Sequence, residues 1–245
     1  MTGATGTAGM RDAHAAHGSA APPARPGSAT ASFTAEAWDR AAPVRAAIDA
    51  LPLVRGLGDG SLTRDRFDYY MAQDALYLAE YGRALAGVAA LSDEPDEFVF
   101  WCDAAREAVV VERALHAAHV DPTAGADASP TCRAYTDFLR ARCALGSYGV
   151  AVAAVLPCFW IYQDVGAGMI ARAGDLGSHP YGDWIATYAD PAFERSTDRA
   201  RSIADRLAQA AGDGERERMH ASFATACRHE WMFWDAAWRM ERSPV

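Results

Sequence analysis

Apolar side chains recur at spacings of three and four residues along most of the chain from residue 33 onward. This spacing lines one face of an α-helix, and no stretch reads convincingly as a β-strand. The pattern predicts an all-α fold, a single-domain helical bundle of about seven or eight helices. The predicted helices cover residues 34–51, 63–91, 95–120, 129–145, a central stretch around 154–166, a short piece at 184–188, a helix opening at 190–191 and a last one ending near 239.

Capping residues and helix breakers set the expected boundaries. Thr34 and Thr63 can each cap a helix by accepting a backbone N–H bond. Ser129 precedes a proline, which suits the first helical turn because an N–H is not needed there. Residues 56–60, Gly-Leu-Gly-Asp-Gly, are expected to form a turn.

The central stretch, Ala154–Gly166, is largely apolar but carries Cys158 and Tyr162, four residues apart and therefore on one helical face. Pro157 lacks an N–H and crowds the preceding turn, so the helix is expected to kink there. Two interpretations stay open at this point. The thiol is either a nucleophile that points into a cavity or a buried cysteine that acts as a small apolar side chain.

Composition narrows the function classes. The chain has 245 residues, of which 51% are hydrophobic and 22% charged, as in folded soluble proteins. A net charge of −9 argues against a nucleic-acid partner, which requires clustered positive charge. All 23 basic residues are arginine, so Schiff-base chemistry, lysine-bound pyridoxal phosphate and a Walker-type phosphate loop are excluded.

Other features bear on location and on domain organisation. No apolar run is expected to be long enough to span a membrane, and hence no membrane partner is expected. Five cysteines without metal-binding spacing fit a reducing compartment, so the cytoplasm is the expected location. Residues 1–31 are rich in Ala, Gly, Ser, Thr and Pro, which predicts a disordered tail, without the apolar core of a secretory signal, before a domain at 32–245.

Two acidic residues lie in apolar, aromatic surroundings. Asp74 stands three residues before Tyr77 on one helical face, and Glu230 precedes Phe233 and Trp234. A carboxyl among aromatic rings tends to have a raised pKa and can serve as a general acid. Surface charges and structural ion pairs are the ordinary alternative for both.

A metal site is the competing interpretation. Glu112, His116 and His119 share one helical face, as in carboxylate-bridged iron bundles, and residues 229–235 offer a partial second set of ligands. Too few ligands converge for strong binding, which favours a solvated helical face and no metal.

Four separated motifs resemble, in order and spacing, those of thiaminase II, the TenA family. They are Gln73-Asp-Ala-Leu-Tyr77, Leu156-Pro-Cys-Phe-Trp-Ile-Tyr162, Trp184-Ile-Ala-Thr-Tyr188 and Glu230-Trp-Met-Phe-Trp234, and the resemblance runs from about residue 33 to residue 239. It implies a haem-oxygenase-like bundle, usually a homotetramer, that uses no cofactor. His229 departs from it, because a tyrosine is common at that position, and the chain ends soon after Trp238.

The resemblance also implies roles for individual residues. Cys158 corresponds to the nucleophile, Asp74 to the aspartate that pairs with the aminopyrimidine edge, and Glu230 to the acid/base near the leaving group. The implied substrate-binding residues are Asp74, Tyr77, Tyr135, Tyr162, Tyr188 and Phe233.

The leading hypothesis is therefore a hydrolase of aminopyrimidines in thiamin salvage, with thiamin itself as a second possible substrate. A thiolate that adds to the pyrimidine ring breaks its aromaticity and allows the leaving group on the methylene carbon to depart. The alternatives are a metal-dependent or cofactorless oxidase on the same bundle, similar to the pyrroloquinoline-quinone synthesis protein, and a non-catalytic regulator.

Overall fold

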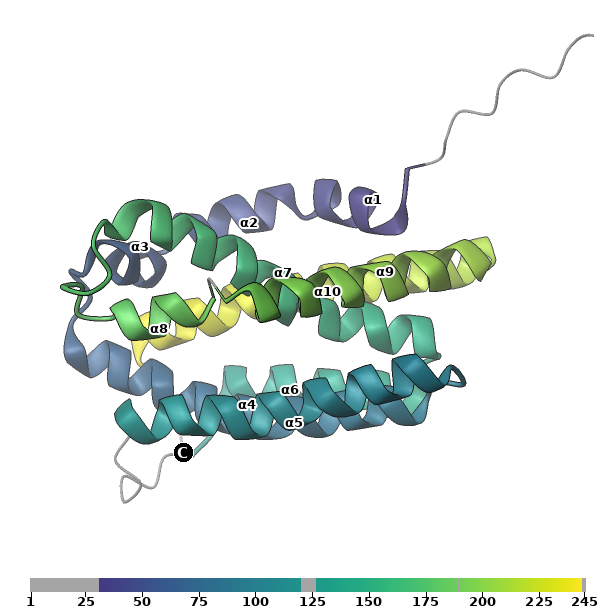
Figure 1. The fold of residues 1–245 in the computed structure, drawn as a ribbon, viewed down its shortest axis with the longest axis horizontal. Helices are drawn as coiled ribbons and strands as arrows, with labels where there is room; N and C mark the ends of the chain where they lie inside the picture. The colour runs from purple at the N-terminus through teal and green to yellow at the C-terminus, as the bar shows by residue number, and fades with distance from the viewer. Residues whose placement is uncertain (1–30, 120–126, 189, 244–245) are drawn as a thin grey trace, which may run out of the picture. The chain divides into compact units, whose positions relative to one another are not determined.

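The computed structural model describes residues 31–119, 127–188 and 190–243, with only the backbone at 111–119. These residues form ten α-helices and no strand, which confirms the all-α class (Figure 1). The helices are α1 (Phe33–Arg40), α2 (Ala42–Asp49), α3 (Pro52–Asp59), α4 (Arg64–Ala90), α5 (Pro95–His119), α6 (Pro130–Leu145), α7 (Tyr148–Ala173), α8 (Gly182–Thr187), α9 (Pro191–Ala210) and α10 (Asp213–Arg239). The predicted tail lies outside the described residues, except for Ala31.

Two long helices, α7 and α10, pack against each other in the core of residues 31–243 (Figure 1). α7 also contacts α3, α6 and α9, while α4 packs against α5 and α6. Because neighbours surround the first half of α7, its residues Val150–Leu156 are all buried, and this part of the helix is apolar on every side. α10 contacts α4 and α6 as well, which ties the two sets of helices together.

The expectation that no helix could span a membrane is wrong for α7 by length and composition. Its 26 residues include an 18-residue window with a mean hydropathy of 1.5. Of that window, 78% is buried against the rest of the protein, so α7 is used here as a core helix. The helix continues through Pro157 as one element, and the nearby carbonyl of Val155 accepts a hydrogen bond from the Tyr81 hydroxyl.

The predicted helix over residues 34–51 is in fact two helices, α1 and α2. Pro43 in the first turn of α2 has no N–H with which to continue α1. The cap of α1 is Ser32, whose hydroxyl accepts a first-turn N–H, and not Thr34. Thr34 instead donates from its N–H and its hydroxyl to Asp205 of α9, each over 2.8 Å, and so fixes α1 to α9.

Two further predicted boundaries differ from the structure. The stretch 56–60 is not a turn, because α3 runs through most of it and only Gly60 adopts a left-handed conformation, with φ of 75°. Gly56 lies so close to the next segment that a Cβ there would stand 3.1 Å from the backbone nitrogen of Leu62. Thr63 precedes α4 as predicted, but its side chain makes no capping bond to the helix.

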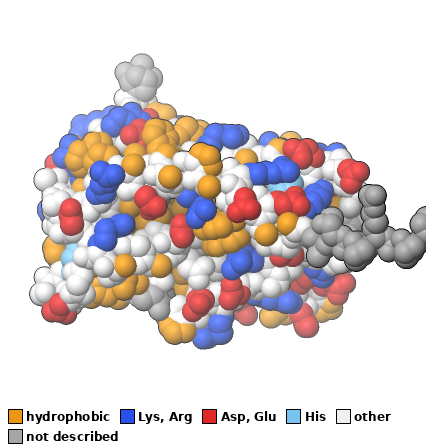
Figure 2. Space-filling view, turned by 90° about the horizontal axis from the view of Figure 1, so that it is seen from above, with side chains coloured by type: hydrophobic (Ala, Val, Ile, Leu, Met, Phe, Trp, Pro, Cys, Tyr) orange, Lys and Arg blue, Asp and Glu red, His pale blue; other side chains and the backbone are white. Residues whose placement is uncertain are grey.

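Arginine and acidic side chains are interspersed on the face shown in Figure 2. Along the helices such side chains form local ion pairs, for example Arg64 with Asp68 at 2.7 Å and Arg239 with Asp235 at 2.8 Å. Pairs of this kind support individual helices weakly. The arginines on this face are thus dispersed among acids and not gathered in a basic patch.

Candidate active site

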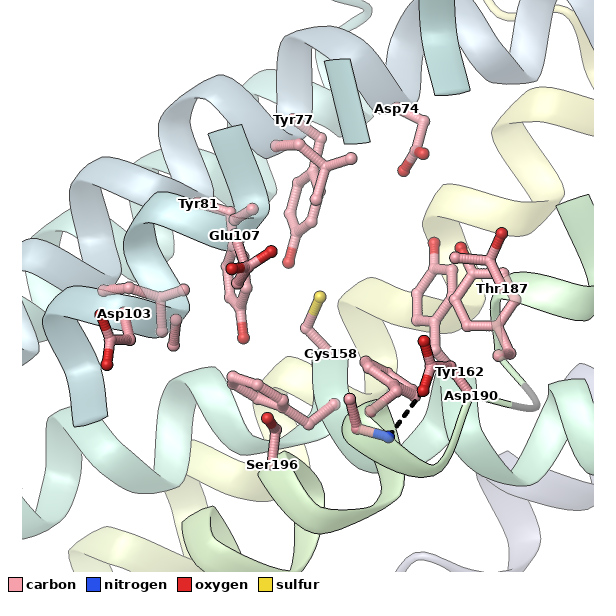
Figure 3. A pocket seen from close by; sticks show the side chains of 18 of the residues that line it. Asp74, Tyr77, Tyr81, Asp103, Glu107, Cys158, Tyr162, Thr187, Asp190 and Ser196 are labelled. Carbon is pink, nitrogen blue, oxygen red and sulfur yellow. Dashed lines mark hydrogen bonds between the residues drawn. The ribbon is translucent and has the colours of Figure 1, made fainter. Parts of the chain in front are cut away.

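A cavity of about 370 Å³ opens between α4, α5, α7 and the start of α9 (Figure 3). Small-molecule sites commonly have volumes of about 300–1,000 Å³. The described residues that line it come from α4 (Asp74, Tyr77, Leu78, Tyr81, Leu85), α5 (Phe100, Asp103, Ala104, Glu107, Ala108), α7 (Cys158, Phe159, Tyr162) and the end of α8 to α9 (Thr187, Tyr188, Asp190, Ala192, Phe193, Ser196).

Five of the predicted site residues line this cavity, namely Asp74, Tyr77, Cys158, Tyr162 and Tyr188. The other three, Tyr135, Glu230 and Phe233, are not among its lining residues. The rings of Tyr135 and Phe233 pack on Tyr77, with centroid distances of 5.0 and 5.4 Å. They therefore lie behind the wall that Tyr77 forms, because α10 and α6 approach the cavity from outside it.

Cys158 occupies the middle of the cavity. In Figure 3 its sulfur points into the open space between Tyr77 and Tyr162. Burial raises the pKa of the thiol well above its usual value, and the negative charge of Glu230 raises it further. The hydroxyls of Tyr77 and Tyr81 act in the opposite direction. The resting thiol is therefore protonated at neutral pH and requires a base to become a nucleophile.

Glu230 supplies a titratable group close to that thiol. Its side chain is 1% exposed, and Oε1 accepts a hydrogen bond of 2.6 Å from the Tyr135 hydroxyl. Burial raises the pKa of Glu230 to about 8, and the Tyr135 bond partly opposes this rise. A carboxyl with this pKa exchanges a proton near neutral pH, as general acid–base catalysis requires.

Asp74 projects from α4 into the cavity (Figure 3), although only 2% of it is exposed. The preceding residue, Gln73, holds this part of α4 in place. Its amide donates to the carbonyl of Asp127 and accepts the N–H of Ser129, which caps α6. A rigid carboxylate in a flat, aromatic cavity can accept two parallel hydrogen bonds from a ring that carries an amino group.

Stacked aromatic rings fix the walls of the cavity. Tyr70 stacks on Trp234 with centroids 5.1 Å apart, and its hydroxyl lies 3.3 Å from that of Tyr162. The ring of Tyr162 in turn packs on that of Tyr188, with centroids 5.5 Å apart. The Tyr77 hydroxyl is buried and lies near the Cys158 thiol, but it makes no hydrogen bond of normal geometry with the described residues, so it is available to a bound molecule.

His229, the departure from the family pattern, packs behind the same wall. Its ring stacks on Tyr135 with a centroid distance of 5.0 Å and an angle of 6° between the planes. Burial and then the charge of Arg228 lower the pKa of His229, so the ring is mainly neutral at pH 7. A neutral, flat ring can occupy the place of a tyrosine without altering the bond from Tyr135 to Glu230.

A family model described as TENA/THI-4/PQQC matches residues 38–240, nearly all of the described helices. The chain belongs to the TENA/THI-4/PQQC family.

Curated relatives support this assignment. The chain is 36% identical over 207 residues to the thiamine biosynthesis multifunctional protein ThiED of Corynebacterium glutamicum, of which it spans only 27%, about a quarter of the length. It is 31% identical over 215 residues to the aminopyrimidine aminohydrolase of Halalkalibacterium halodurans, with 84% of this chain and 96% of that protein covered. The aminopyrimidine aminohydrolase of Bacillus subtilis is 29% identical over 197 residues, covering 78% of this chain and 83% of that protein.

Solved structures share the fold. A TenA homologue from P. horikoshii superposes with a TM-score of 0.76 and 25% identity, covering 85% of this chain and 99% of that chain. A Shewanella denitrificans domain described as having a heme oxygenase-like fold superposes with a TM-score of 0.66 at 12% identity, covering 86% and 94%. The predicted haem-oxygenase-like bundle is confirmed.

The candidate metal ligands belong to α5. The side chains of Glu112, His116 and His119 lie outside the part of the chain whose side chains the structure describes. Among the residues whose side chains are described, no three His, Cys, Asp or Glu groups converge in a way that could hold a metal ion.

Several lining residues were not predicted from the sequence. Tyr81 follows Tyr77 by one helical turn and stacks on it at 5.5 Å, so its spacing alone could have indicated it. Asp103 and Glu107 of α5 and Phe193 of α9 carried no comparable signal, because their place in the cavity depends on how α5 and α9 pack.

Proposed function

We propose that the chain hydrolyses 4-amino-5-aminomethyl-2-methylpyrimidine to the hydroxymethyl pyrimidine and ammonia, a reaction of thiamin salvage. The observation that carries the proposal is a thiol in a flat aromatic cavity, with the Asp74 carboxylate on its wall and Glu230, of pKa about 8, behind it. The chain aligns with most of the length of two relatives that bear the name aminopyrimidine aminohydrolase.

Asp74 orients the substrate in this proposal. Its two oxygens accept hydrogen bonds from the amino group and the adjacent ring position of the pyrimidine. The rings of Tyr162 and Tyr188 hold the flat heterocycle by stacking. The ring of Tyr77, next to Cys158, gives the pyrimidine a further aromatic wall.

The first chemical stage makes the nucleophile and expels the amine. Ionised Glu230 takes the proton of the Cys158 thiol by way of the intervening tyrosine hydroxyls, among which Tyr135 already donates to it. The sulfur bonds to a ring carbon, and the displaced electron pair moves through the ring and breaks the bond between methylene and nitrogen. Glu230 returns the proton to the departing nitrogen, which leaves as ammonia.

The second stage restores the enzyme. Water adds its oxygen to the exocyclic methylene carbon and gives a proton to Glu230. The electrons return through the ring, the carbon–sulfur bond breaks, and aromaticity is regained. Cys158 recovers its proton from Glu230, so the overall change is one amine and one water converted to one alcohol and one ammonia.

Cleavage of thiamin follows the same steps with a thiazole as leaving group, and we propose it as a slower activity. The family resemblance implies a homotetramer, and the five cysteines favour the cytoplasm. Both belong to the same proposal.

A product assay tests the proposal. Purified protein is incubated separately with the aminomethyl pyrimidine and with thiamin, and the hydroxymethyl pyrimidine is quantified by chromatography. We expect rapid formation from the first compound and slow formation or none from the second. Cys158→Ser serves as the matched negative control, and the absence of product from both compounds with wild-type protein would rule the function out.

A further inference from the structure

The groups assigned to the pyrimidine occupy only part of the cavity. In Figure 3, Asp74, Tyr162 and Thr187 lie on one side of Cys158, whereas Asp103 and Ser196 lie on the other. The second side is formed by α5 and α9, and we call it the α5–α9 subsite, defined by Phe100, Asp103, Ala104, Glu107, Phe193 and Ser196. Nothing in the proposed hydrolysis of the small aminomethyl compound requires this space.

The α5 wall of the subsite is one continuous helical face. Its cavity-lining residues lie at positions 100, 103, 104, 107 and 108, which follow the three- and four-residue spacing of a helix. Phe100 and Ala104 give this face an apolar body, and Phe193 faces it from α9. The space suits an apolar substituent attached to the group that leaves.

The charged side chains among the described lining residues of the cavity all have one sign. Its nineteen described lining residues include Asp74, Asp103, Glu107 and Asp190, but no arginine or histidine. Asp190 accepts the N–H of Ala192 as the cap of α9, and Glu107 is paired with Arg106. Asp103 forms no ion pair with another described residue. A concave apolar space bordered by these carboxylates favours a cation and repels an anion.

A second, independent observation points to a bound molecule at this place. Tyr77 is only 2% exposed, and its hydroxyl lacks a hydrogen-bond partner of normal geometry among the described residues. The hydroxyl points toward Cys158, where the two sides of the cavity meet (Figure 3). A buried polar group of this kind is normally satisfied, so a ligand that reaches past Cys158 would complete the site.

We propose that the α5–α9 subsite binds the leaving group and selects substrates whose leaving amine is cationic and carries an apolar substituent. This inference rests on the proposed function and extends it to N-alkylated aminomethyl pyrimidines. Asp103 and Glu107 attract the protonated form of such an amine into the cavity, and the amine gives this proton to solvent before Glu230 protonates the departing nitrogen. Phe100 and Phe193 contact the alkyl part of the amine. Substituents that bear a carboxylate or phosphate are disfavoured by the same two acids.

The test compares two substrates of similar length, one with an uncharged and one with an anionic substituent on the leaving amine. One is the N-propyl derivative of the aminomethyl pyrimidine, and the other is its N-(2-carboxyethyl) derivative. The enzyme variant is Asp103→Asn with Glu107→Gln, which removes both charges and almost no volume. The matched control is Asp198→Asn with Glu217→Gln, which changes net charge equally at two ion-paired positions that do not line the cavity.

We expect the cavity double variant to lower kcat/KM for the N-propyl compound by about 2- to 30-fold at low salt, the range for two exposed charge interactions. The same variant should raise kcat/KM for the carboxyethyl compound. Both effects should shrink in high salt, because screening weakens exposed charges. The control variant should change neither value.

The outcomes separate the two proposals. If wild-type protein does not hydrolyse the parent aminomethyl compound, the proposed function and this inference both fail. A second outcome is that the parent compound is hydrolysed while the double variant changes kcat/KM for both derivatives in the same direction, or by no more than the control variant does. In that case the charge selection assigned to Asp103 and Glu107 is wrong. Circular dichroism of each variant shows whether the fold is retained.

Discussion

Replacing Glu230 with glutamine isolates the energetic effect of burying an ionisable carboxyl in the core. Burial raises the pKa of Glu230 from 4.5 to about 8, partly opposed by the bond from Tyr135. Because the folded-state pKa lies above the unfolded one, the protein favours the protonated carboxyl. Its contribution to stability is therefore complete below about pH 4.5 and is lost as the pH rises through about 8.

The size of the effect follows from that difference. Between pH 4.5 and pH 7 the unfolded carboxyl is ionised while the folded one stays largely protonated. At about 1.4 kcal/mol per pH unit, the free energy of unfolding falls by roughly 3 kcal/mol across this interval. Glutamine has nearly the same size, never ionises, and can still accept the hydrogen bond from Tyr135. The Glu230→Gln variant should therefore be more stable than wild type by about 3 kcal/mol at pH 7.

Urea unfolding at pH 5, 6 and 7, at fixed protein concentration, measures this directly. The difference between the variant and wild type should grow by about 2 to 3 kcal/mol from pH 5 to pH 7, since all other groups titrate alike in both proteins. Glu217→Gln, at an exposed position paired with Arg40, is the control and should show no such growth. A difference that stays constant with pH would refute a raised pKa at Glu230.

The remaining predictions concern activity. Glu230→Gln should lower cleavage of both compounds, because both need Glu230 to take the thiol proton. The loss should be larger for the aminomethyl compound, about 10²–10⁴-fold, because only its nitrogen must be protonated as it leaves; equal losses in the product assay would show that Glu230 does not protonate the leaving group. Cys158→Ser should reduce turnover to a few per cent or less while pyrimidine binding by calorimetry persists, and a largely active variant would exclude the covalent step. In wild type, kcat/KM should rise with pH toward a plateau above about 8, because ionised Glu230 must accept the thiol proton; a profile that falls over this range would contradict that order of proton transfers. Removal of residues 1–30, which keeps the Ala31 carbonyl that accepts from Arg216, should leave Tm and activity unchanged; a shift in either would show that the segment docks on the protein.

The parts of the fold and site that follow from local spacing were predictable from the sequence. Helix α4 was predicted to within about one residue, and the positions of Asp74 and Tyr77 on one of its faces follow from the periodicity. The motif that contains Cys158 and Tyr162 likewise placed both residues on one wall of the cavity. In each case the relevant residues are a single helical turn apart, so packing does not change their relation.

Relations between distant helices were not predictable in the same way. The expected turn at 56–60 is helical because Gly56 allows α3 to approach the backbone of Leu62, a contact that composition alone does not indicate. Asp103 and Glu107 have the pattern of an ordinary solvated helical face. They border the cavity only because α5 packs along α4 beside it.

Burying titratable groups around Cys158 lowers the stability of the fold, and other side chains of the same size could fill this space. Burial raises the pKa of Cys158, Tyr77, Tyr135 and Glu230, so each is held in its neutral form. Glutamine at position 230 would preserve the hydrogen bond from Tyr135 without the loss of stability at neutral pH. Replacing this carboxyl should therefore stabilise the fold and impair proton transfer together, which is the combination expected where a buried acid is kept for chemistry and not for structure.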